Sequence, residues 1–481
     1  MNHCPKPTPL ACAPSETTTQ PPRKNAQLNP AIILLSIIFL AMALTYGVRS
    51  GQFQREDIRV IPGTYQVLEK NSSLSQLFTL APRPANSAIA QPVSLAETFM
   101  AIPLAIEKRS GLIFMVLFIG GMFAVLNKAG TVDAGLDRLL GATRGNVYIL
   151  VPTLMLVLSA GSTFMGLAKE YIMFVPVMVA MANRLGLPSI VGLAIVALSV
   201  KTGYMGSISN PIALSVAQPL VGLPVFSGLS MRVVAYFTFV PLAAAYILYY
   251  IRRSGFDTSA TFSHAGAKLS IRHTLSLVAL GLGIGFLVYA SNQWHWKYPE
   301  LSAYYLALTM VFAAIAGMRP STTASTFVEG MNKMLMAGVL IALATAVESI
   351  LATGQVLDTL VNGLSHAIGQ HGQLPAAFGM FFAQMSLDLV IPSTSGQAAV
   401  TMPIFGPLGQ LAGVSPQSTV YAFLLGNGLT NMITPTSSGL LVLLAAANVG
   451  WGQWAKFVLP LFLTCMAVAL ALLAFAVLSG Y

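Results

Sequence analysis

Two long apolar stretches of this chain, residues 158–224 and 384–449, are interrupted by short runs of Gly, Pro, Ser, Thr and Asn. These runs read SAGST at 159–163, GSISNP at 206–211, PSTSG at 392–396, GNGLTN at 426–431 and TPTSS at 434–438. Hydrocarbon offers no partner to backbone N–H and C=O groups, so such breaks persist only inside protein or beside a watery cavity. Paired interruptions, one set in each half of a chain, are typical of the binding site of a secondary transporter.

The composition supports a membrane location. Of the 481 residues, 55% are hydrophobic and only 8% are charged, whereas a soluble domain carries roughly 25% charged residues. Several apolar runs approach or reach the roughly 20 residues that a helix needs to cross a bilayer core. Clear examples are residues 31–48, 112–126, 233–251, 275–291, 303–318 and 457–478. We therefore expect an all-α polytopic protein of the cytoplasmic (inner) membrane, surrounded by lipid bilayer, with about 10–12 transmembrane segments.

The charges and cysteines exclude several other classes of protein. The net charge of +10 comes without a long Lys/Arg run, so the bases indicate membrane topology rather than a nucleic-acid partner. Cys4, Cys12 and Cys465 lack the spacing of a metal site or a disulfide framework. The chain contains no Walker A sequence and no His/Cys metal constellation. We expect no enzyme activity, and no cofactor other than Na⁺ or H⁺ as a coupling ion.

The chain divides into two membrane halves. Residues 1–30 are rich in Pro, Thr and Gln and are expected to be a disordered cytoplasmic tail. The first half is predicted over 31–251, with an exported polar segment at about 49–94. An amphipathic or re-entrant stretch at 95–106 is expected to follow it, before the second long helix. The basic residues of 252–272 predict a cytoplasmic linker, and 273–481 form the second half.

The two halves share an order of features. Residues 170–186 resemble 397–413, and each segment is followed by apolar residues that lead to an Asn/Ser/Thr-rich break before a proline. The 14 residues of 397–410 would give a helix of roughly 21 Å, which is too short for a hydrocarbon core of about 30 Å. We therefore predict two inverted repeats, each with a re-entrant hairpin and a discontinuous helix. The hairpin tips are expected near Ser162 and Ser395.

The breaks supply the candidate binding residues. Half-helix N-termini favour carboxylates, and exposed carbonyls with Asn, Ser and Thr oxygens can ligate Na⁺. Substrate contact is expected from Ser393, Thr394, Ser395, Gly396, Ser209, Asn210, Thr436 and Ser437. Coordination of a coupling ion or proton is expected from Ser159, Thr163, Glu170, Asp388, Asn427 and Asn431. The alternative is that the breaks are simple kinks, with Ser and Thr hydroxyls bonded back to the helix.

Five charged residues fall in apolar surroundings, namely Lys169, Glu170, Lys201, Glu348 and Asp388. Charges inside a membrane are costly and indicate function by default. Snorkelling at the membrane interface is the alternative, and it suits Lys169 and Lys201 best. Asp388, close to the second break, could bind Na⁺, shuttle a proton or pair with a cationic substrate; its alternative is a structural hydrogen bond.

At these residues the sequence resembles the anaerobic four-carbon dicarboxylate carrier family, and its YfcC-type branch in particular. The resemblance rests on GLAKE at 166–170, NPIALSVAQ at 210–218, GLPVFSG at 222–228, STSGQAAVTMP at 393–403 and NMITPTS at 431–437. It implies a fold of the ion transporter superfamily with inverted repeats, two re-entrant hairpins, a homodimer and elevator-type movement. Two positions depart from the pattern, since Lys169 stands where relatives often carry a second acid and Asp388 where Asn is implied.

We interpret the chain as a secondary active transporter, ion-coupled or exchanging, of small organic acids that resemble C4-dicarboxylates. One alternative is an antiporter of basic amino acids, in which Glu170 or Asp388 would face the substrate ammonium. A second is an ion channel that uses the same breaks as a selectivity filter. A membrane enzyme is a third, which the missing catalytic constellation disfavours.

Overall fold

The structure is a computed structural model that describes residues 30–56, 59–61, 63–79, 89–143, 146–168, 170–255, 270–294, 296–368 and 372–481. The predicted disordered tail lies outside these residues except for Pro30, as do Lys169 and most of the predicted linker 252–272. The described part of the chain is mainly helical, as the sequence predicts.

The helices follow one another with short connections. Up to the linker they are α1 (Pro30–Gly47), α2 (Leu95–Lys128), α3 (Thr131–Thr143), α4 (Val147–Met165), α5 (Phe174–Arg184), α6 (Ser189–Gly206), α7 (Pro211–Leu220) and α8 (Leu229–Arg253), with 3-10 turns η1 (Leu74–Phe78) and η2 (Glu170–Met173). After it they are α9 (Ile271–Gln293), α10 (Tyr298–Ala316), α11 (Pro320–Thr353), α12 (Leu357–Ile368), α13 (Gln373–Asp388), α14 (Thr394–Leu411), α15 (Pro416–Thr430), α16 (Ser438–Ala446) and α17 (Trp451–Leu478).

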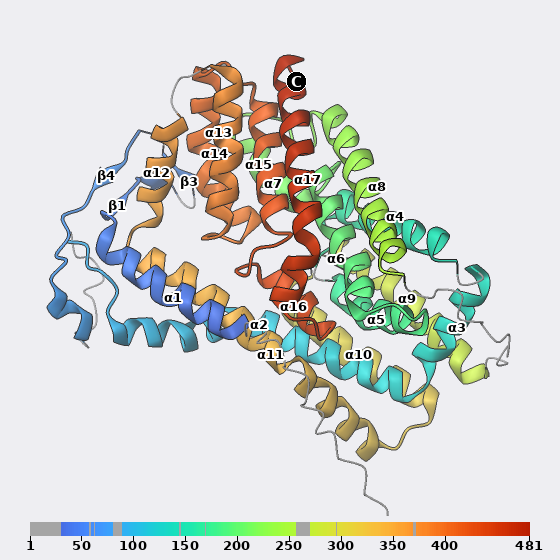
Figure 1. Ribbon diagram of the computed structural model, residues 1–481. Helices are drawn as coiled ribbons and strands as arrows, with labels where there is room; N and C mark the ends of the chain where they lie inside the picture. Colours follow the sequence, from blue (N-terminus) through green and yellow to red (C-terminus); the bar gives the residue numbers. More distant parts are fainter. Residues whose placement is uncertain are drawn as a thin grey trace, which may run out of the picture.

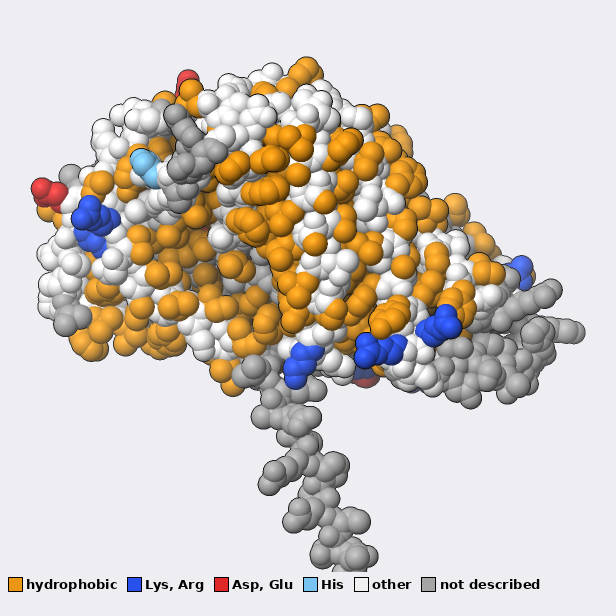
Figure 2. Space-filling model, turned by 45° about the horizontal axis from the view of Figure 1, so that its top comes forward, with side chains coloured by type: hydrophobic (Ala, Val, Ile, Leu, Met, Phe, Trp, Pro, Cys, Tyr) orange, Lys and Arg blue, Asp and Glu red, His pale blue; other side chains and the backbone are white. Residues whose placement is uncertain are grey.

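The apolar runs found in the sequence lie in helices α1, α2, α8, α9, α10 and α17. Among the described residues, seven segments are long and apolar enough to cross a membrane, and α1 and α9 contribute two shorter apolar helices. Figure 2 shows a broad apolar surface with Lys and Arg side chains near its lower edge. This distribution is expected for a protein whose middle faces lipid and whose charged rim faces water.

One predicted boundary is wrong. Residues 95–106 are not a separate amphipathic or re-entrant stretch, because they form the first part of the continuous 34-residue helix α2. The helix begins this early because Ser94 and Glu97 form a capping box, in which each side chain accepts a hydrogen bond from the other residue's backbone amide. Helix α2 is therefore about 51 Å long, well beyond the thickness of a bilayer core.

The order of helices is repeated in the two halves. Helices α2 and α11 each have 34 residues, and the short helices α3 and α12 that follow have 13 and 12. Next come α4 and α13, α5 and α14, and then α6 and α15 with 18 and 15 residues. Each half closes with a very short helix, α7 or α16, and a long one, α8 or α17. The inverted orientation of these repeats and the re-entrant course of the hairpins stay predictions.

The helices form two groups in space (Figure 1). Helices α1, α2, α10 and α11 lie against one another as a helix layer. The second group, here called the bundle, contains α4–α8 and α13–α17. Within the layer, α2 and α11 approach closely at Gly120 and Gly330, where a Cβ added to Gly120 would lie 2.8 Å from the Gly330 carbonyl oxygen. In the bundle, contact between α6 and α15 joins the two halves of the chain.

Short strands follow α1 and pack against the second half. Strand β1 (Gly51–Gln52) pairs antiparallel with β4 (Gln66–Val67), and β2 (Arg55–Glu56) pairs antiparallel with β3 (Arg59–Val60). These strands belong to the segment predicted to be exported, and they lie beside α12 and α14.

Candidate functional site

A cavity of about 100 Å³ lies where the two halves of the bundle meet. Its described lining comes from both halves and comprises Ser162, Gly166, Ala168, Val200, Lys201, Tyr204, Asn210, Ile212, Thr394, Asn427 and Asn431. All of these residues belong to bundle helices or to the links between them. The breaks that the sequence pairs across the two halves thus border one common space.

The end of α4 holds the break between α6 and α7 in place. The Ser162 hydroxyl donates to the Val200 carbonyl at 2.8 Å, and the Asn210 amide group donates to the Ser162 carbonyl at 3.2 Å. The Thr163 hydroxyl accepts a hydrogen bond from the Ile208 backbone amide at 3.0 Å. Asn210 also caps α7, because its side-chain oxygen accepts from the Ile212 amide at 3.0 Å. The polar residues of this break therefore fix its backbone as well as facing the cavity.

The first half gives the cavity its charge. Lys201 is the one charged residue among the described lining residues. Among the described residues, none forms a hydrogen bond or an ion pair with its amino group, although Asp388 lies within electrostatic range. Tyr204, one helical turn further along α6, has a buried hydroxyl that faces the Thr394 side chain of the same lining. The cavity thus holds a cation that is available to a ligand, and beside it the paired side chains of Tyr204 and Thr394.

The second half contributes a helix N-terminus. Ser393 caps α14, and its hydroxyl accepts from the Gly396 amide at 3.3 Å. No described residue accepts a hydrogen bond from the backbone amides of Thr394 and Ser395, as expected for the first turn of a helix. Because the positive end of the helix dipole lies here and Thr394 lines the cavity, this end of α14 favours an anion.

Asp388 lies directly behind the cavity and is completely buried. Asn427 donates to its Oδ1 at 2.6 Å, and Asn431 donates to Oδ1 at 2.8 Å and to Oδ2 at 2.9 Å. The two asparagines stand between the carboxylate and the cavity, which they line themselves. Burial of a carboxylate is costly unless hydrogen bonds compensate it, and these donors supply that compensation.

The same network ties the turn between α13 and α14 to the break after α15. The Asn427 amide group also donates to Gln397 Oε1 at 2.8 Å, and Gln397 donates to Gln384 Oε1 at 2.6 Å. On the other side, the Ser437 hydroxyl donates to Asn431 Oδ1 at 2.7 Å. A change at Asp388 would therefore disturb both the turn between α13 and α14 and the break after α15.

The structure brings together only some of the residues predicted for the site. Four of them line the cavity, namely Asn210, Thr394, Asn427 and Asn431. Behind these lie Asp388, Ser437 and the cap residue Ser393. The others lie outside the described lining: Ser395 is exposed, Gly396 adjoins the Ser393 cap, Ser209 donates to the Phe164 carbonyl, Thr436 bonds with Thr434, and Glu170 accepts from the Ala168 amide.

The predicted break at 159–163 is displaced. These residues lie inside α4, which continues to Met165 and ends at Gly166 with a left-handed φ of 71°. The hydroxyl of Ser159 donates back to the Leu156 carbonyl at 3.1 Å and lies 3.0 Å from the Tyr236 hydroxyl. The alternative of helix-bonded hydroxyls thus holds for Ser159, while Thr163 supports the neighbouring break.

Sequence reasoning noted Lys201 only as a charge in apolar surroundings, and it selected neither Lys201 nor Tyr204, Gln384 or Gln397 as site residues. The spacing of Lys201 and Tyr204, three residues apart on one helix face, is the signal that could have found the first two. Snorkelling, the alternative offered for Lys201, does not describe a side chain that lines this cavity. Glu348, by contrast, pairs with Lys108 at 3.4 Å and Arg109 at 3.7 Å between α11 and α2, away from the cavity.

The chain is similar to a known protein family and to individual proteins of two bacteria. A family model described as "C4-dicarboxylate anaerobic carrier" matches residues 30–478. A relative in Escherichia coli (strain K12), "Putative basic amino acid antiporter YfcC", is 27% identical over 484 residues, 92% of this chain and 94% of that protein. An uncharacterized protein of Haemophilus influenzae is 23% identical over 477 residues, 89% of this chain and 92% of that protein.

Two solved structures are similar over most of their length. The YdaH transporter of Alcanivorax borkumensis has a TM-score of 0.43 at 15% identity, covering 94% of this chain and 99% of that one. MtrF of Neisseria gonorrhoeae, described as illuminating a class of antimetabolite efflux pumps, has a TM-score of 0.40 at 15% identity, covering 94% and 96%.

Proposed function

The chain belongs to the C4-dicarboxylate anaerobic carrier family, and from this premise we propose that it carries small organic acids resembling C4-dicarboxylates across the cytoplasmic membrane. Membership of the family makes it a multi-pass membrane transporter. The proposal adds the substrate class, the membrane and the mode of transport, which is exchange or coupling to Na⁺ or H⁺.

The charge of the cavity is the observation that supports the substrate class. Lys201, the Tyr204 hydroxyl and the backbone amides at the start of α14 are donors. Of the described acids nearby, Asp388 is engaged by Asn427 and Asn431, and Glu170 by the Ala168 amide. A carboxylate placed between Lys201 and the start of α14 would replace missing partners on both sides. Such a site suits an anion better than a cation.

A basic amino-acid antiporter is the second candidate, because the Escherichia coli relative carries that name. Its α-carboxylate could occupy the same position beside Lys201. Its ammonium groups would need an acid, and the candidates are Asp388 behind the cavity and Glu170, which accepts from the Ala168 amide of the lining. For Asp388 to serve, Asn427 or Asn431 would have to turn its amide group away, which a dicarboxylate does not require.

The mechanism proposed is elevator-type alternating access. The described cavity lining is confined to the bundle, so the bundle can carry a bound substrate past the helix layer without dismantling the site. The homodimer that the family resemblance implies belongs to the same proposal, with the layer as the stationary part. The ion-coupling residues are proposed to be Asp388 with Asn427 and Asn431, which could present oxygen atoms to Na⁺ if their amide groups turn.

Counterflow in proteoliposomes tests this function. Vesicles containing the purified protein are loaded with unlabelled succinate, and uptake of labelled succinate, fumarate, arginine or ornithine is followed. We expect saturable accumulation of the dicarboxylates, which other dicarboxylates inhibit. Accumulation of the basic amino acids alone would support the second candidate instead. Flux that neither saturates nor exchanges would indicate a channel.

A further inference from the structure

The short strands after α1 are anchored in the helix layer. They follow α1 directly, and α2 begins after the same segment. At its base, the Ser50 hydroxyl donates to the Gly354 carbonyl at 2.9 Å and the Gly51 amide donates to the Gln355 carbonyl at 3.0 Å, both at the end of α11. On the far side, the Val93 amide donates to the Thr45 hydroxyl of α1 at 2.9 Å. The segment therefore starts and ends on the layer.

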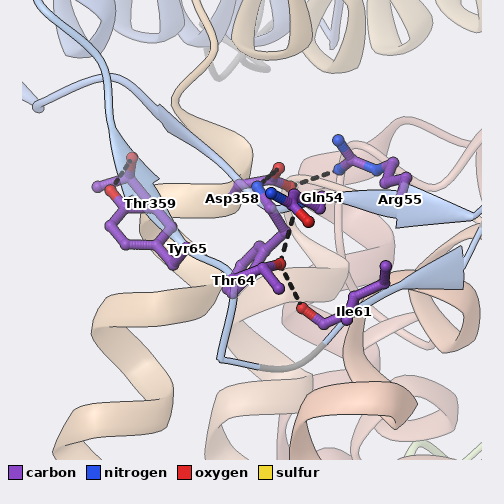
Figure 3. A network of polar contacts seen from close by, with 8 residues as sticks. Gln54, Arg55, Ile61, Thr64, Tyr65, Asp358 and Thr359 are labelled. Atoms are coloured by element: carbon purple, nitrogen blue, oxygen red, sulfur yellow. Dashed lines mark hydrogen bonds and ion pairs between the residues drawn. The ribbon is translucent and has the colours of Figure 1, made fainter.

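From this base the strands continue along the first turn of α12, which begins at Leu357, three residues after Gly354 (Figure 3). Asp358 accepts the Phe53 backbone amide on Oδ2 at 3.0 Å and the Arg55 guanidinium on Oδ1 at 2.6 Å. Its side chain is 6% exposed, whereas that of Arg55 is 40% exposed. The Tyr65 hydroxyl lies 2.8 Å from the Thr359 hydroxyl. Both of these donors to the buried carboxylate thus come from the strand segment, one from β2 and one from the link between β1 and β2.

Apolar contacts extend the attachment to α14. Val60 of β3 is 2% exposed, and β3 lies against α14. The rings of Phe53 and Tyr65 pack together with centroids 5.3 Å apart. Tyr65 also covers Gly51, where an added Cβ would lie 2.2 Å from its hydroxyl oxygen. Burial of Val60 against α14 removes apolar surface from water and so stabilises the attachment, while the Tyr65 contacts hold the strand segment itself together.

The helices that the strands contact, α12 and α14, are connected to the binding cavity. Helix α12 lies against α13 and α14, and α14 begins at Thr394 in the cavity. The equivalent helix of the first half, α3, has α2, α5 and α9 as its neighbours. Its ion pair, Arg184 with Asp133 at 2.6 Å, stays within one half and is much more exposed, with side chains 32% and 59% exposed. The attachment is therefore one-sided.

We infer that strands β1–β4 form a strap, which fastens α12 and α14 to the helix layer and must release them before the bundle can move. The inference rests on the proposed alternating access, in which the bundle moves and the layer does not. Because the strap stays on the layer, movement of α12 with the bundle would separate Asp358 from Phe53 and Arg55. Transport would then depend on repeated opening and closing of this contact.

Cross-linking tests whether the strap opens. In a background with Cys4 and Cys12 replaced by Ser and Cys465 by Ala, Tyr65→Cys and Thr359→Cys are joined with a short bifunctional maleimide. We expect dicarboxylate uptake to fall in proportion to the cross-linked fraction. The matched control joins Gln52→Cys to Gln66→Cys, which are opposed residues of β1 and β4 within the strap. Cross-linking this pair should leave uptake unchanged.

A second measurement does not depend on that pair. Val60→Cys, at a buried position of β3, is treated with a membrane-impermeant maleimide before and during counterflow. We expect several-fold faster labelling during counterflow, because the side chain is exposed only when the strap leaves α14. The proposal is overturned if fully cross-linked Tyr65→Cys/Thr359→Cys protein transports normally, or if labelling is equally slow with and without transport. Absence of uptake by the uncross-linked background protein would instead contradict the proposed function.

Discussion

At the scale of single residues, the site is a buried polar network with one carboxylate at its centre. Asp388 is compensated by Asn427 and Asn431 rather than by a basic partner in direct contact. A buried carboxyl group held by neutral donors has lost its solvation, so it can respond to a cation or a proton that arrives beside it. This arrangement gives Asp388 two roles that experiments can separate, coupling and structure.

Asp388→Asn should separate those roles, because it keeps the side-chain size and removes the charge. If Asp388 carries a coupling proton, uptake should lose its pH dependence while counterflow exchange persists, since exchange needs no net proton movement. If it binds Na⁺, the variant should need more Na⁺ for the same uptake, because Asn retains one oxygen ligand. Asp133→Asn, at an exposed position of α3, is the control. Unaltered pH dependence, Na⁺ dependence and substrate range would make Asp388 purely structural.

At the scale of helices, close approach of backbones sets the geometry around the cavity. A Cβ added to Gly203 of α6 would lie 2.6 Å from the Ser159 carbonyl oxygen of α4. In the second half, a Cβ added to Gly426 of α15 would lie 2.7 Å from the Phe381 carbonyl oxygen of α13. These glycines occupy matching helices of the two halves, and each allows the neighbouring helix to pack without a side chain between them.

Gly426→Ala should therefore separate α13 from α15 and disturb the Asp388 network. We expect destabilisation by about 1–3 kcal/mol, the usual effect of overpacking, seen as a lower unfolding temperature in detergent. Gly439→Ala is the matched control, because Gly439 of α16 has open space around its Cα. An unfolding temperature for Gly426→Ala equal to that of the control would contradict this packing.

The helices show how far sequence reasoning reaches. Apolar runs predict helices well, because a chain in hydrocarbon must satisfy its backbone hydrogen bonds locally. The same argument misplaces residues 95–106 and 159–163. A polar residue can either end a helix or form a hydrogen bond back to it, and which of the two occurs depends on the neighbouring helices. The capping pair Ser94 and Glu97 is visible in the sequence, whereas the hydroxyl partner of Ser159, Tyr236, lies far along the chain.

Part of the site was predictable because breaks between helices are visible in the sequence. Asn210, Thr394, Asn427 and Asn431 could be chosen because they stand at breaks, and breaks in both halves must meet to share one cavity. Lys201 was not assigned to the site, because it lies within the helix α6 rather than at a break, and its spacing to Tyr204 gives a helix face without saying which face meets α15. Periodicity places side chains on a helix face but leaves the identity of the facing helix open.

At the scale of the whole molecule, the repeated order of helices produces a cavity to which both halves contribute, whereas among the described residues the strap contacts α12 and α14 of the second half. The cavity lining belongs to the bundle, while the strap fastens α12 and α14 of the second half to the helix layer. If the bundle moves, the two connecting helices are restrained differently. The strap holds α12, whereas α3 has α2, α5 and α9 as its neighbours. We therefore expect transport to depend on release of the second half from the strap.

We propose that the cavity holds a substrate carboxylate beside Lys201, and counterflow by Lys201→Met tests this contact most directly. Methionine keeps the length of the side chain and removes its charge, and a hydrogen bond to a charged group is worth roughly 1.5–3 kcal/mol. We therefore predict a loss of affinity for labelled succinate of about 10- to 100-fold. Lys456→Met, at an exposed position of α17, should exchange succinate like the unaltered protein. Normal exchange by a well-folded Lys201→Met protein would show that Lys201 does not hold the substrate carboxylate.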